Sequence, residues 1–356
     1  MVMQLIEKQY ICQMIRRLLL SLLLVGCLLP LHSQRPKVGL VLGGGGAKGA
    51  TEVGVLKEIE RAGIKIDYIA GTSIGSIVGG LYSVGYRADD LDSLFRTQNW
   101  IALLTERDTT LTKRIVKKED GVTYLFGFPV RRRKSDTATK RRFGLLRGDA
   151  VYHFLDSLVA NAPIYRQYPS GKRRQKVRQT TSVSSKSRAR CKPIPFRCVA
   201  FDIRRHQQIV LSDDSLARNM RASMAIPGGF KPVILDSMTL VDGGMINNLP
   251  VDVVREMGAD VVIAIDLTQN KHDDYQSPLR FLRRLGGMVR WLVERPDFKR
   301  YNENRKLADI YINPDLGNYS VTSFSTKSIA DMIEIGQKAG RQHFDELRRL
   351  AHKRTF

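Results

Sequence analysis

Residues 37–49 have the sequence KVGLVLGGGGAKG, and residues 64–76 have the sequence IKIDYIAGTSIGS. Each segment starts as a short apolar strand and ends in a glycine-rich turn. Between them, Val53, Leu56 and Ile59 fall on one face of a predicted helix. A strand, a helix and a second strand predict a βαβ unit with a parallel sheet. The two glycine turns are therefore expected to lie close together.

The first turn contains four consecutive glycines at positions 43–46. Glycine N–H groups can approach a ligand closely, and a following helix N-terminus attracts negative charge. Phosphate binding, oxyanion stabilisation and a purely structural turn all remain open at this point. Gly44, Gly46 and Gly49 match a dinucleotide-binding spacing, although any glycine run does so. A P-loop is excluded because Lys48 is followed by Gly49 and not by Ser or Thr.

The second turn has the Gly-x-Ser-x-Gly pattern of a nucleophile elbow, formed by Gly71, Ser73 and Gly75. Apolar residues at helical spacing follow it from position 74 to position 81, so the pattern stands between a strand and a helix, as an elbow requires. A serine nucleophile beside a loop of amide donors makes a coherent acyl-transfer site. A dinucleotide-binding site would not require the Gly-x-Ser-x-Gly pattern of the second turn.

An elbow serine needs a proton acceptor. The chain has six histidines, and none of them stands in the glycine-rich loop context of a catalytic base. A carboxylate offers an alternative, because Asp242 ends a predicted strand and enters a turn formed by Gly243 and Gly244. It is expected at the carboxyl end of the sheet, where Ser73 should emerge. A desolvated carboxylate can accept the proton of a serine, although an Asp before Gly is also a common turn former.

Three segments of this chain resemble the three motifs of the patatin-like phospholipases: residues 44–49, residues 71–75 and residues 242–244. Residues 222–228 and 247–250 resemble flanking segments of that family. The resemblance covers about residues 37–270, apart from a divergent middle. Lys48 stands where many members have Arg. Longer bacterial members continue into an outer-membrane β-barrel, whereas we expect helices after residue 270.

The resemblance implies a three-layer α/β/α fold with a mostly parallel central sheet, and hydrolysis of glycerolipid acyl esters without a metal or a cofactor. It implies that Ser73 is the nucleophile, that Asp242 is the general base, and that the oxyanion hole is formed by Gly44, Gly45 and Gly46. The remaining motif positions support this site; they are Lys48, Gly49, Gly71, Gly75, Gly243 and Gly244.

The first 33 residues have the layout of a secretory signal. Arg16 and Arg17 precede an apolar stretch over residues 18–31, and the small residue Ser33 follows. We expect cleavage after Ser33 and an exported protein, which is periplasmic, outer-membrane-associated or secreted. Residues 24–27 also resemble a lipobox, so lipidation at Cys27 is the alternative. Cys191 and Cys198 could pair in an oxidising compartment, but we favour a buried Cys198 in a strand.

The net charge of +23 is concentrated in one region. Residues 113–205 contain 25 Lys and Arg against six acids, which accounts for +19 of it. We predict a basic, partly disordered insert here, densest at 131–134, 140–142 and 172–190. Contact with an anionic membrane is one interpretation, and a solvated insert is the other. Export argues against a nucleic-acid partner.

We expect a signal peptide at 1–33, a catalytic domain at 34–270 and, at 271–356, a helical extension packed on the same domain, with helices predicted at 281–293 and 329–350. An exported serine lipid acyl hydrolase is the function that the residues favour. A nucleotide-binding protein that uses residues 44–49 and a non-catalytic lipid-binding protein are the alternatives. Only the hydrolase needs both Ser73 and Asp242.

Overall fold

A computed structural model describes residues 35–105, 144–166, 193–212, 215–269 and 298–352, as well as Met14 and Arg16. The chain divides into two units, and every element named below lies in the unit formed by residues 37–352. Its central sheet has eight strands: β1 (Val38–Leu42), β2 (Tyr68–Thr72), β4 (Phe196–Asp202), β5 (Gln207–Ser212), β7 (Val233–Leu235), β8 (Met238–Asp242), β9 (Val261–Ile265) and β10 (Ile310–Ile312).

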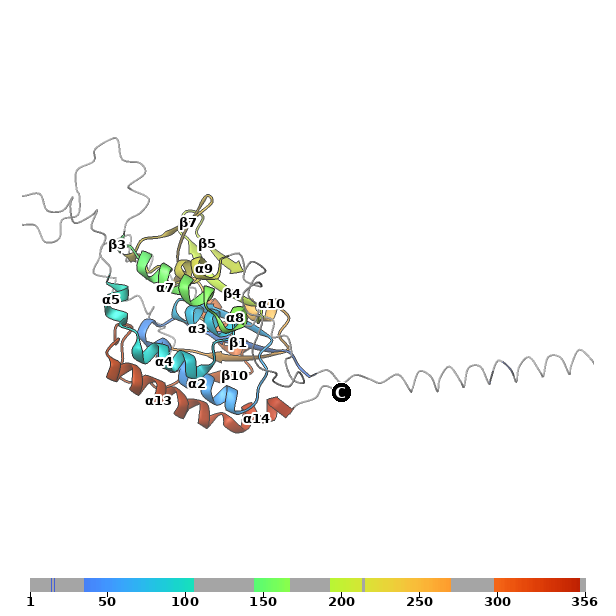
Figure 1. Ribbon diagram of the computed structural model, residues 1–356. Helices are drawn as coiled ribbons and strands as arrows, with labels where there is room; N and C mark the ends of the chain where they lie inside the picture. Colours follow the sequence, from blue (N-terminus) through green and yellow to red (C-terminus); the bar gives the residue numbers. More distant parts are fainter. Residues whose placement is uncertain are drawn as a thin grey trace, which may run out of the picture. The chain divides into compact units, whose positions relative to one another are not determined.

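The sheet has the strand order β10-β9-β1-β2-β4-β8-β7, and β5 pairs with the other edge of β4 (Figure 1). The five strands from β10 to β4 are parallel to one another, while β5 and β8 run antiparallel to β4. Leu42 at the end of β1 lies opposite Gly71 in β2. The two glycine turns therefore leave the sheet side by side at its carboxyl edge. A separate small sheet pairs β3 (Gly144–Leu146) with β6 (Gly228–Phe230).

Helices cover both faces of the central sheet (Figure 1). On one face lie α2 (Gly49–Arg61) and α3 (Ile74–Ser83), and three helices surround α2: α4 (Ala88–Thr97), α13 (Thr326–Gln342) and α14 (Phe344–His352). The other face is covered by α10 (Val251–Glu256) and α12 (Phe298–Leu307). The other helices are α5 (Trp100–Leu104), α7 (Asp149–Ala160), α8 (Pro163–Arg166), α9 (Leu216–Ser223) and the short 3-10 turns η1 (Gly46–Lys48) and η4 (Gly243–Met245).

Two apolar cores follow from the alternation of side chains along the buried strands. Leu40 and Leu42 of β1 belong to the core beneath α2 and α3, whereas Val41 belongs to the core beneath α10. All three side chains are fully buried. This three-layer α/β/α arrangement, with a mostly parallel sheet, confirms the predicted fold class.

The region after residue 270 differs in two respects from the helices predicted there. The residues 329–350 form two helices and not one, because His343 leaves the helical conformation between α13 and α14. Asp345 and Glu346 then stand in the first turn of α14, where acidic side chains stabilise a helix N-terminus. In addition, β10 adds a parallel strand to the edge of the sheet beside β9. The extension is therefore part of the same sheet as the catalytic motifs.

Several predicted features lie outside the described residues: the signal segment except Met14 and Arg16, the three dense basic runs, the helix at 281–293, and Cys191. Cys198 is a buried, free thiol in β4. None of the helices in the described ranges combines the length and the apolar character that crossing a bilayer requires.

Candidate active site

Ser73 occupies a sharp turn between β2 and α3. Its backbone has φ 54° and ψ −122°, a conformation that costs about 1–3 kcal/mol for a residue other than glycine. The flanking glycines are needed because there is no room for a side chain. A Cβ on Gly71 would lie 2.4 Å from the carbonyl oxygen of Gly75, and a Cβ on Gly75 would lie 2.3 Å from that of Leu42. The turn therefore has the geometry of a nucleophile elbow.

The hydroxyl of Ser73 donates a hydrogen bond to the carboxylate of Asp242. Ser73 Oγ and Asp242 Oδ2 are 2.7 Å apart, although the residues are 169 positions apart in the sequence. Both are buried, with exposed fractions of 8% for Ser73 and 2% for Asp242. The structure thus brings together the two residues that the sequence predicted as nucleophile and base.

The turn after β8 holds Asp242 in place. The N–H of Gly244 donates to Asp242 Oδ1 at 2.7 Å, and the Asp242 N–H donates to the Ala225 carbonyl at 2.9 Å. A Cβ on Gly243 would lie 2.2 Å from the Val199 carbonyl oxygen, so the close approach to β4 requires glycine. Burial raises the pKa of Asp242 to about 6, while the hydrogen bonds from Ser73 and Gly244 act in the opposite direction. A base with this pKa is mostly ionised at neutral pH and still accepts a proton readily.

The glycine loop after β1 lies against the nucleophile turn. A Cβ on Gly44 would be 3.1 Å from the Cβ of Ser73. The N–H of Gly44 is already used, because it donates to the Asn248 carbonyl at 3.2 Å. Among the described residues, the N–H groups of Gly45 and Gly46 have no protein acceptor. Within the described residues, two of the three predicted oxyanion donors, Gly45 and Gly46, thus have an unused N–H group, and their role as donors stays a prediction.

Lys48 and Gly49 connect this loop to α2. A Cβ on Gly49 would lie 2.2 Å from Cγ1 of Ile74, so glycine allows α2 to begin directly beside the first residue of α3. Lys48 is half-buried, and this burial lowers the pKa of its ammonium group, while Asp266 acts in the opposite direction.

Asn248 and Ser223 contact the two turns, and the sequence assigned no role to either. Asn248 holds Gly44 twice, since its carbonyl accepts the Gly44 N–H and its Nδ2 donates to the Gly44 carbonyl at 3.1 Å. The Oγ of Ser223 accepts the N–H of Ser73 at 2.9 Å. Both residues lie in the segments that resemble flanking parts of the family, and that position is the only sequence signal that could have indicated them.

Two further contacts come from the region after residue 270. The Ala47 N–H donates to the Val321 carbonyl at 2.9 Å, so the segment before α13 holds the glycine loop. Asn304 of α12 donates to Oδ1 of Asn247 at 3.0 Å, and the Asn247 carbonyl accepts the hydroxyl of Thr72 at 2.8 Å. The extension therefore supports the site as well as the sheet.

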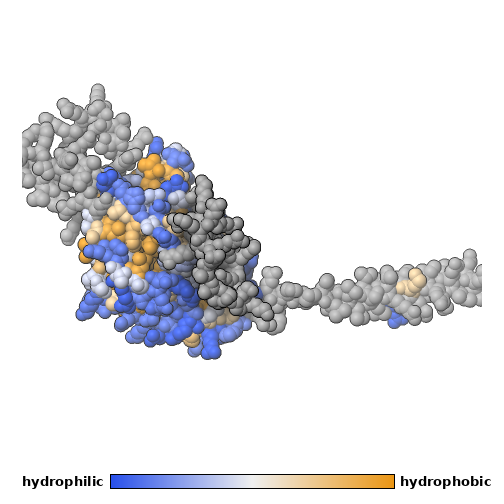
Figure 2. Space-filling view, in the orientation of Figure 1, coloured by the Kyte–Doolittle hydropathy of each residue, from blue (hydrophilic) through white to orange (hydrophobic). Residues whose placement is uncertain are grey.

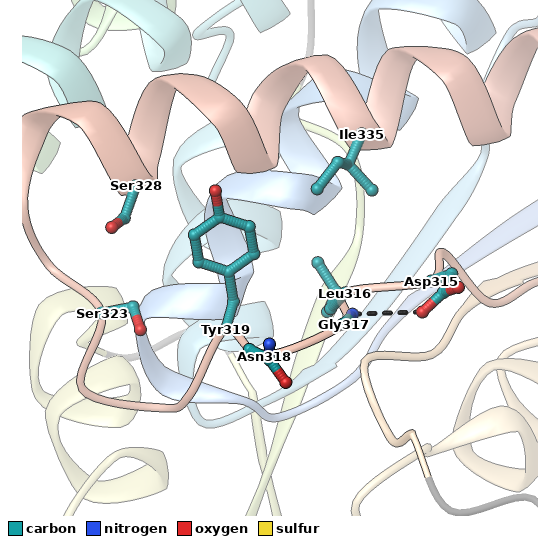
Figure 3. A pocket seen from close by; sticks show the side chains of 8 residues that line it. All are labelled: Asp315, Leu316, Gly317, Asn318, Tyr319, Ser323, Ser328 and Ile335. Carbon is teal, nitrogen blue, oxygen red and sulfur yellow. Dashed lines mark hydrogen bonds between the residues drawn. The ribbon is translucent and has the colours of Figure 1, made fainter.

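A surface cavity of about 580 Å³ lies between residues 315–323 and α13 (Figure 3). Ser328 and Ile335 reach it from the helix, and Tyr319 stands between the helix and the segment, with its hydroxyl donating to Asp331 at 2.7 Å. Neither Ser73 nor Asp242 lines this cavity. Within the part of the chain that the structure describes, His, Cys, Asp and Glu form no group of three or more suited to a metal ion.

Comparison with known proteins places this geometry in a family. The model of the patatin-like phospholipase family matches residues 40–255, which is more than half of the chain. The human "Patatin-like phospholipase domain-containing protein 6" is 32% identical over 239 residues, which are 67% of this chain and 14% of that protein. "Neuropathy target esterase sws" of Drosophila melanogaster is 26% identical over an alignment of 348 positions that covers 90% of this chain and 20% of that protein. The chain thus spans a small part of the length of these relatives.

Among solved structures, VipD from Legionella pneumophila has a similar fold, with a TM-score of 0.52 at 16% sequence identity over 88% of this chain and 67% of that one. At this identity the likeness concerns the fold alone. The family match covers the glycine loop, the Ser73 turn and the Asp242 turn, which the structure brings into contact. On this evidence, the chain belongs to the patatin-like phospholipase family.

Proposed function

We propose that the protein is a lipid acyl ester hydrolase in which Ser73 is the nucleophile and Asp242 is the general base. The observation that carries the proposal is the 2.7 Å hydrogen bond from Ser73 Oγ to Asp242 Oδ2 in a buried site. Membership of the patatin-like phospholipase family supports a lipid ester as the substrate. Glycerolipids, and phospholipids among them, are the substrates that we propose.

The reaction follows from the geometry of the site. Ser73 Oγ attacks the ester carbonyl carbon while its proton passes to Asp242 Oδ2. The N–H groups of Gly45 and Gly46 stabilise the negative charge on the carbonyl oxygen. Collapse of this intermediate breaks the ester C–O bond, and the leaving alcohol takes the proton from Asp242. A water molecule then attacks the acyl-enzyme, Asp242 accepts its proton, and the proton returns to Ser73 as the fatty acid leaves.

The nucleophile is tested by labelling with a fluorophosphonate probe and by hydrolysis of phospholipid vesicles. The wild type should react with the probe and release fatty acid, whereas Ser73→Ala should do neither. Ser83→Ala is the matched control, because Ser83 is also a buried serine in the same region but lies at the far end of α3. Equal labelling of the wild type and Ser73→Ala would refute the assignment. A folded wild type without labelling or hydrolysis would favour a non-catalytic lipid-binding or nucleotide-binding protein.

We also propose that the protein docks on anionic membranes through the basic insert. The insert, predicted near residues 113–205, follows α5 in the sequence, and in α5 Ile101 is 57% exposed while Leu103 and Leu104 are half-buried. Figure 2 shows apolar side chains gathered on the visible face in the region of α5 and α7. Trp100 of α5 packs against Phe324, three residues after the Val321 that holds the glycine loop. A chain that combines an apolar surface with a strongly basic segment suits a membrane with anionic head groups.

Vesicle sedimentation tests the docking proposal. The full-length protein should bind vesicles that contain phosphatidylserine better than vesicles of phosphatidylcholine alone. Deletion of residues 172–190, which contain eight of the basic side chains, should remove most of this difference and leave the hydrolysis of a soluble short-chain ester unchanged. Unchanged binding to the anionic vesicles after the deletion would show that the insert is a solvated loop.

Export is part of the same proposal, because the first 33 residues have the layout of a signal peptide. Mass spectrometry of the protein isolated from a bacterial host distinguishes the two forms of processing that the sequence allows. A chain that begins at Gln34 indicates cleavage after Ser33, and a lipidated N-terminus at Cys27 indicates a lipoprotein. An intact N-terminus in the cytoplasmic fraction would contradict export.

A further inference from the structure

The backbone of the Ser73 turn is hydrogen-bonded to a side-chain hydroxyl, that of Ser223. Three non-glycine residues of the described chain have a positive φ: Ser73, His206 and Asp236. The latter two are exposed residues of hairpin turns, whereas Ser73 is buried. A buried residue keeps such a conformation only where its surroundings hold it there. The contacts of the Ser73 peptide groups therefore matter for the direction of its side chain.

Ser223 supplies one of these contacts. Its Oγ accepts the Ser73 N–H at 2.9 Å and donates to the Val199 carbonyl at 2.6 Å. A serine hydroxyl has a single hydrogen, so donation to Val199 fixes the orientation in which a lone pair faces the Ser73 N–H. Ser223 is fully buried at the end of α9, and Val199 lies in β4. The hydroxyl thus connects the nucleophile turn to two other elements of the fold.

The second peptide group of Ser73 is held within its own helix. Its carbonyl accepts hydrogen bonds from the Ser76 N–H at 2.9 Å and from the Ser76 hydroxyl at 2.6 Å. These contacts move with α3, and they do not fix the turn relative to β4 or β8. The contact with Ser223 does fix the turn relative to these strands. Ser223 also donates to Val199 of β4, and Val199 is next to Ala200, which pairs with Asp242 of β8.

We propose that Ser223 is a positioning residue, whose hydroxyl holds the Ser73 turn so that Ser73 Oγ faces Asp242. The inference rests on the proposed function and deepens it. Because the Ser73 N–H is used by Ser223, that N–H does not serve as an oxyanion donor, and this task stays with Gly45 and Gly46. Removal of the Ser223 hydroxyl leaves the Ser73 N–H buried without an acceptor, and the strained turn can then relax away from Asp242.

The test compares Ser223→Ala and Ser223→Cys with the control Ser83→Ala. Ser83 is a buried serine, 4% exposed, whose hydroxyl donates to the Gly80 carbonyl at the far end of α3. For a soluble p-nitrophenyl ester, Ser223→Ala should lower kcat about 10-fold to 100-fold with KM within about twofold, since misorientation of a nucleophile affects the chemical step. The thiol of Ser223→Cys is a weaker acceptor than a hydroxyl, so the kcat of this variant should lie between those of Ser223→Ala and the wild type. Ser83→Ala should lower the Tm but keep kcat.

The result that overturns the proposal is a Ser223→Ala variant with a wild-type kcat. If Ser223→Ala does not fold, Ser223→Cys decides, and a wild-type kcat in that variant has the same meaning. A Ser73→Ala variant as active as the wild type would instead overturn the proposed function. If the proposed function fails in this way, a crystal structure of Ser223→Ala still tests the positioning role of Ser223. A Ser73 φ still near 54° and an unchanged 2.7 Å contact with Asp242 would refute that role.

Discussion

Two regions beside the glycine loop contain buried carboxylates, and they differ in what surrounds the acid. Asp242 at the end of β8 accepts hydrogen bonds from Ser73 and from the Gly244 N–H. Asp266 follows β9 and is fully buried, and its Oδ2 accepts the hydroxyls of Tyr301 and Tyr311. Asp242 thus faces the proposed nucleophile, whereas Asp266 faces tyrosine hydroxyls, for which no catalytic role is proposed.

Glu52 of α2 belongs to the second region and makes the contrast sharper. It is fully buried, and neither carboxyl oxygen has a hydrogen-bond partner in the described part of the chain. Burial is the main cause that raises its pKa well above the usual value, and the nearby Asp266 acts in the same direction. Burial and a raised pKa therefore do not identify the catalytic acid by themselves. The contact with the strained Ser73 is what distinguishes Asp242 and supports its proposed role as the base. Four experiments test this distinction.

The largest effect is expected for Asp242→Asn. The amide cannot accept the Ser73 proton, so kcat should fall by about 10²–10⁴-fold, the usual range for loss of a general base. The folded state should keep its Tm at pH 7, because the substitution removes a buried charge and retains the shape of the side chain. Steady-state kinetics and thermal unfolding of the same preparation measure both. Activity within tenfold of the wild type would mean that another group accepts the proton.

The pH dependence of the wild type should follow the ionisation of Asp242. Burial raises its pKa to about 6, and only the ionised form accepts the Ser73 proton. Below about pH 6, kcat should therefore fall about tenfold for each pH unit, and above about pH 7 it should reach a plateau. The measurement is kcat for a soluble ester between pH 4.5 and 8.5. A flat profile down to pH 4.5 would contradict an Asp242 base with a raised pKa.

Asp266→Asn should lower the stability of the protein, whereas Asp242→Asn should lower its activity. The carboxylate accepts hydrogen bonds from the hydroxyls of the buried Tyr301 and the half-buried Tyr311 and, at 2.9 Å, from the Thr268 N–H. Replacement by a neutral amide weakens charge-assisted bonds and should lower the free energy of unfolding by about 1–3 kcal/mol. Urea denaturation measures the change, and kcat of the folded protein should stay within about threefold. A loss of activity as large as that of Asp242→Asn would remove the distinction between the two regions.

The smallest effect is expected for Glu52→Gln. The folded state holds the Glu52 proton more tightly than the unfolded chain does, so the acid makes folding less favourable as the pH rises above its unfolded pKa of about 4.3. The glutamine should therefore raise the free energy of unfolding by about 1 kcal/mol at pH 8 and by little at pH 4.5. Glu256→Gln on the exposed side of α10 is the control. A stabilisation that does not grow with pH would contradict a raised pKa of the buried Glu52.

The local patterns were sufficient for much of the fold and for the two central residues of the site. Some features can be recognised from a few consecutive residues. Examples are a glycine that a close backbone contact requires, as at Gly75, and a strand that leads into a helix. The break at His343 and the strand β10 left a weaker signal, because His343 is not a helix-breaking residue type and β10 has three residues. Their conformations depend on packing against α2 and β9.

The βαβ unit, the elbow serine and the aspartate at the end of a strand are each encoded by neighbouring residues, so they could be predicted without a structure. Which groups meet depends on how the strands and helices pack. Gly44 is bound by Asn248, which is 204 positions away, and so it is not a free oxyanion donor. Ser73 is held by Ser223 from 150 positions away. Hydrogen bonds are directional and need their partners within about 3 Å, so such contacts exist only after the strands and helices have packed.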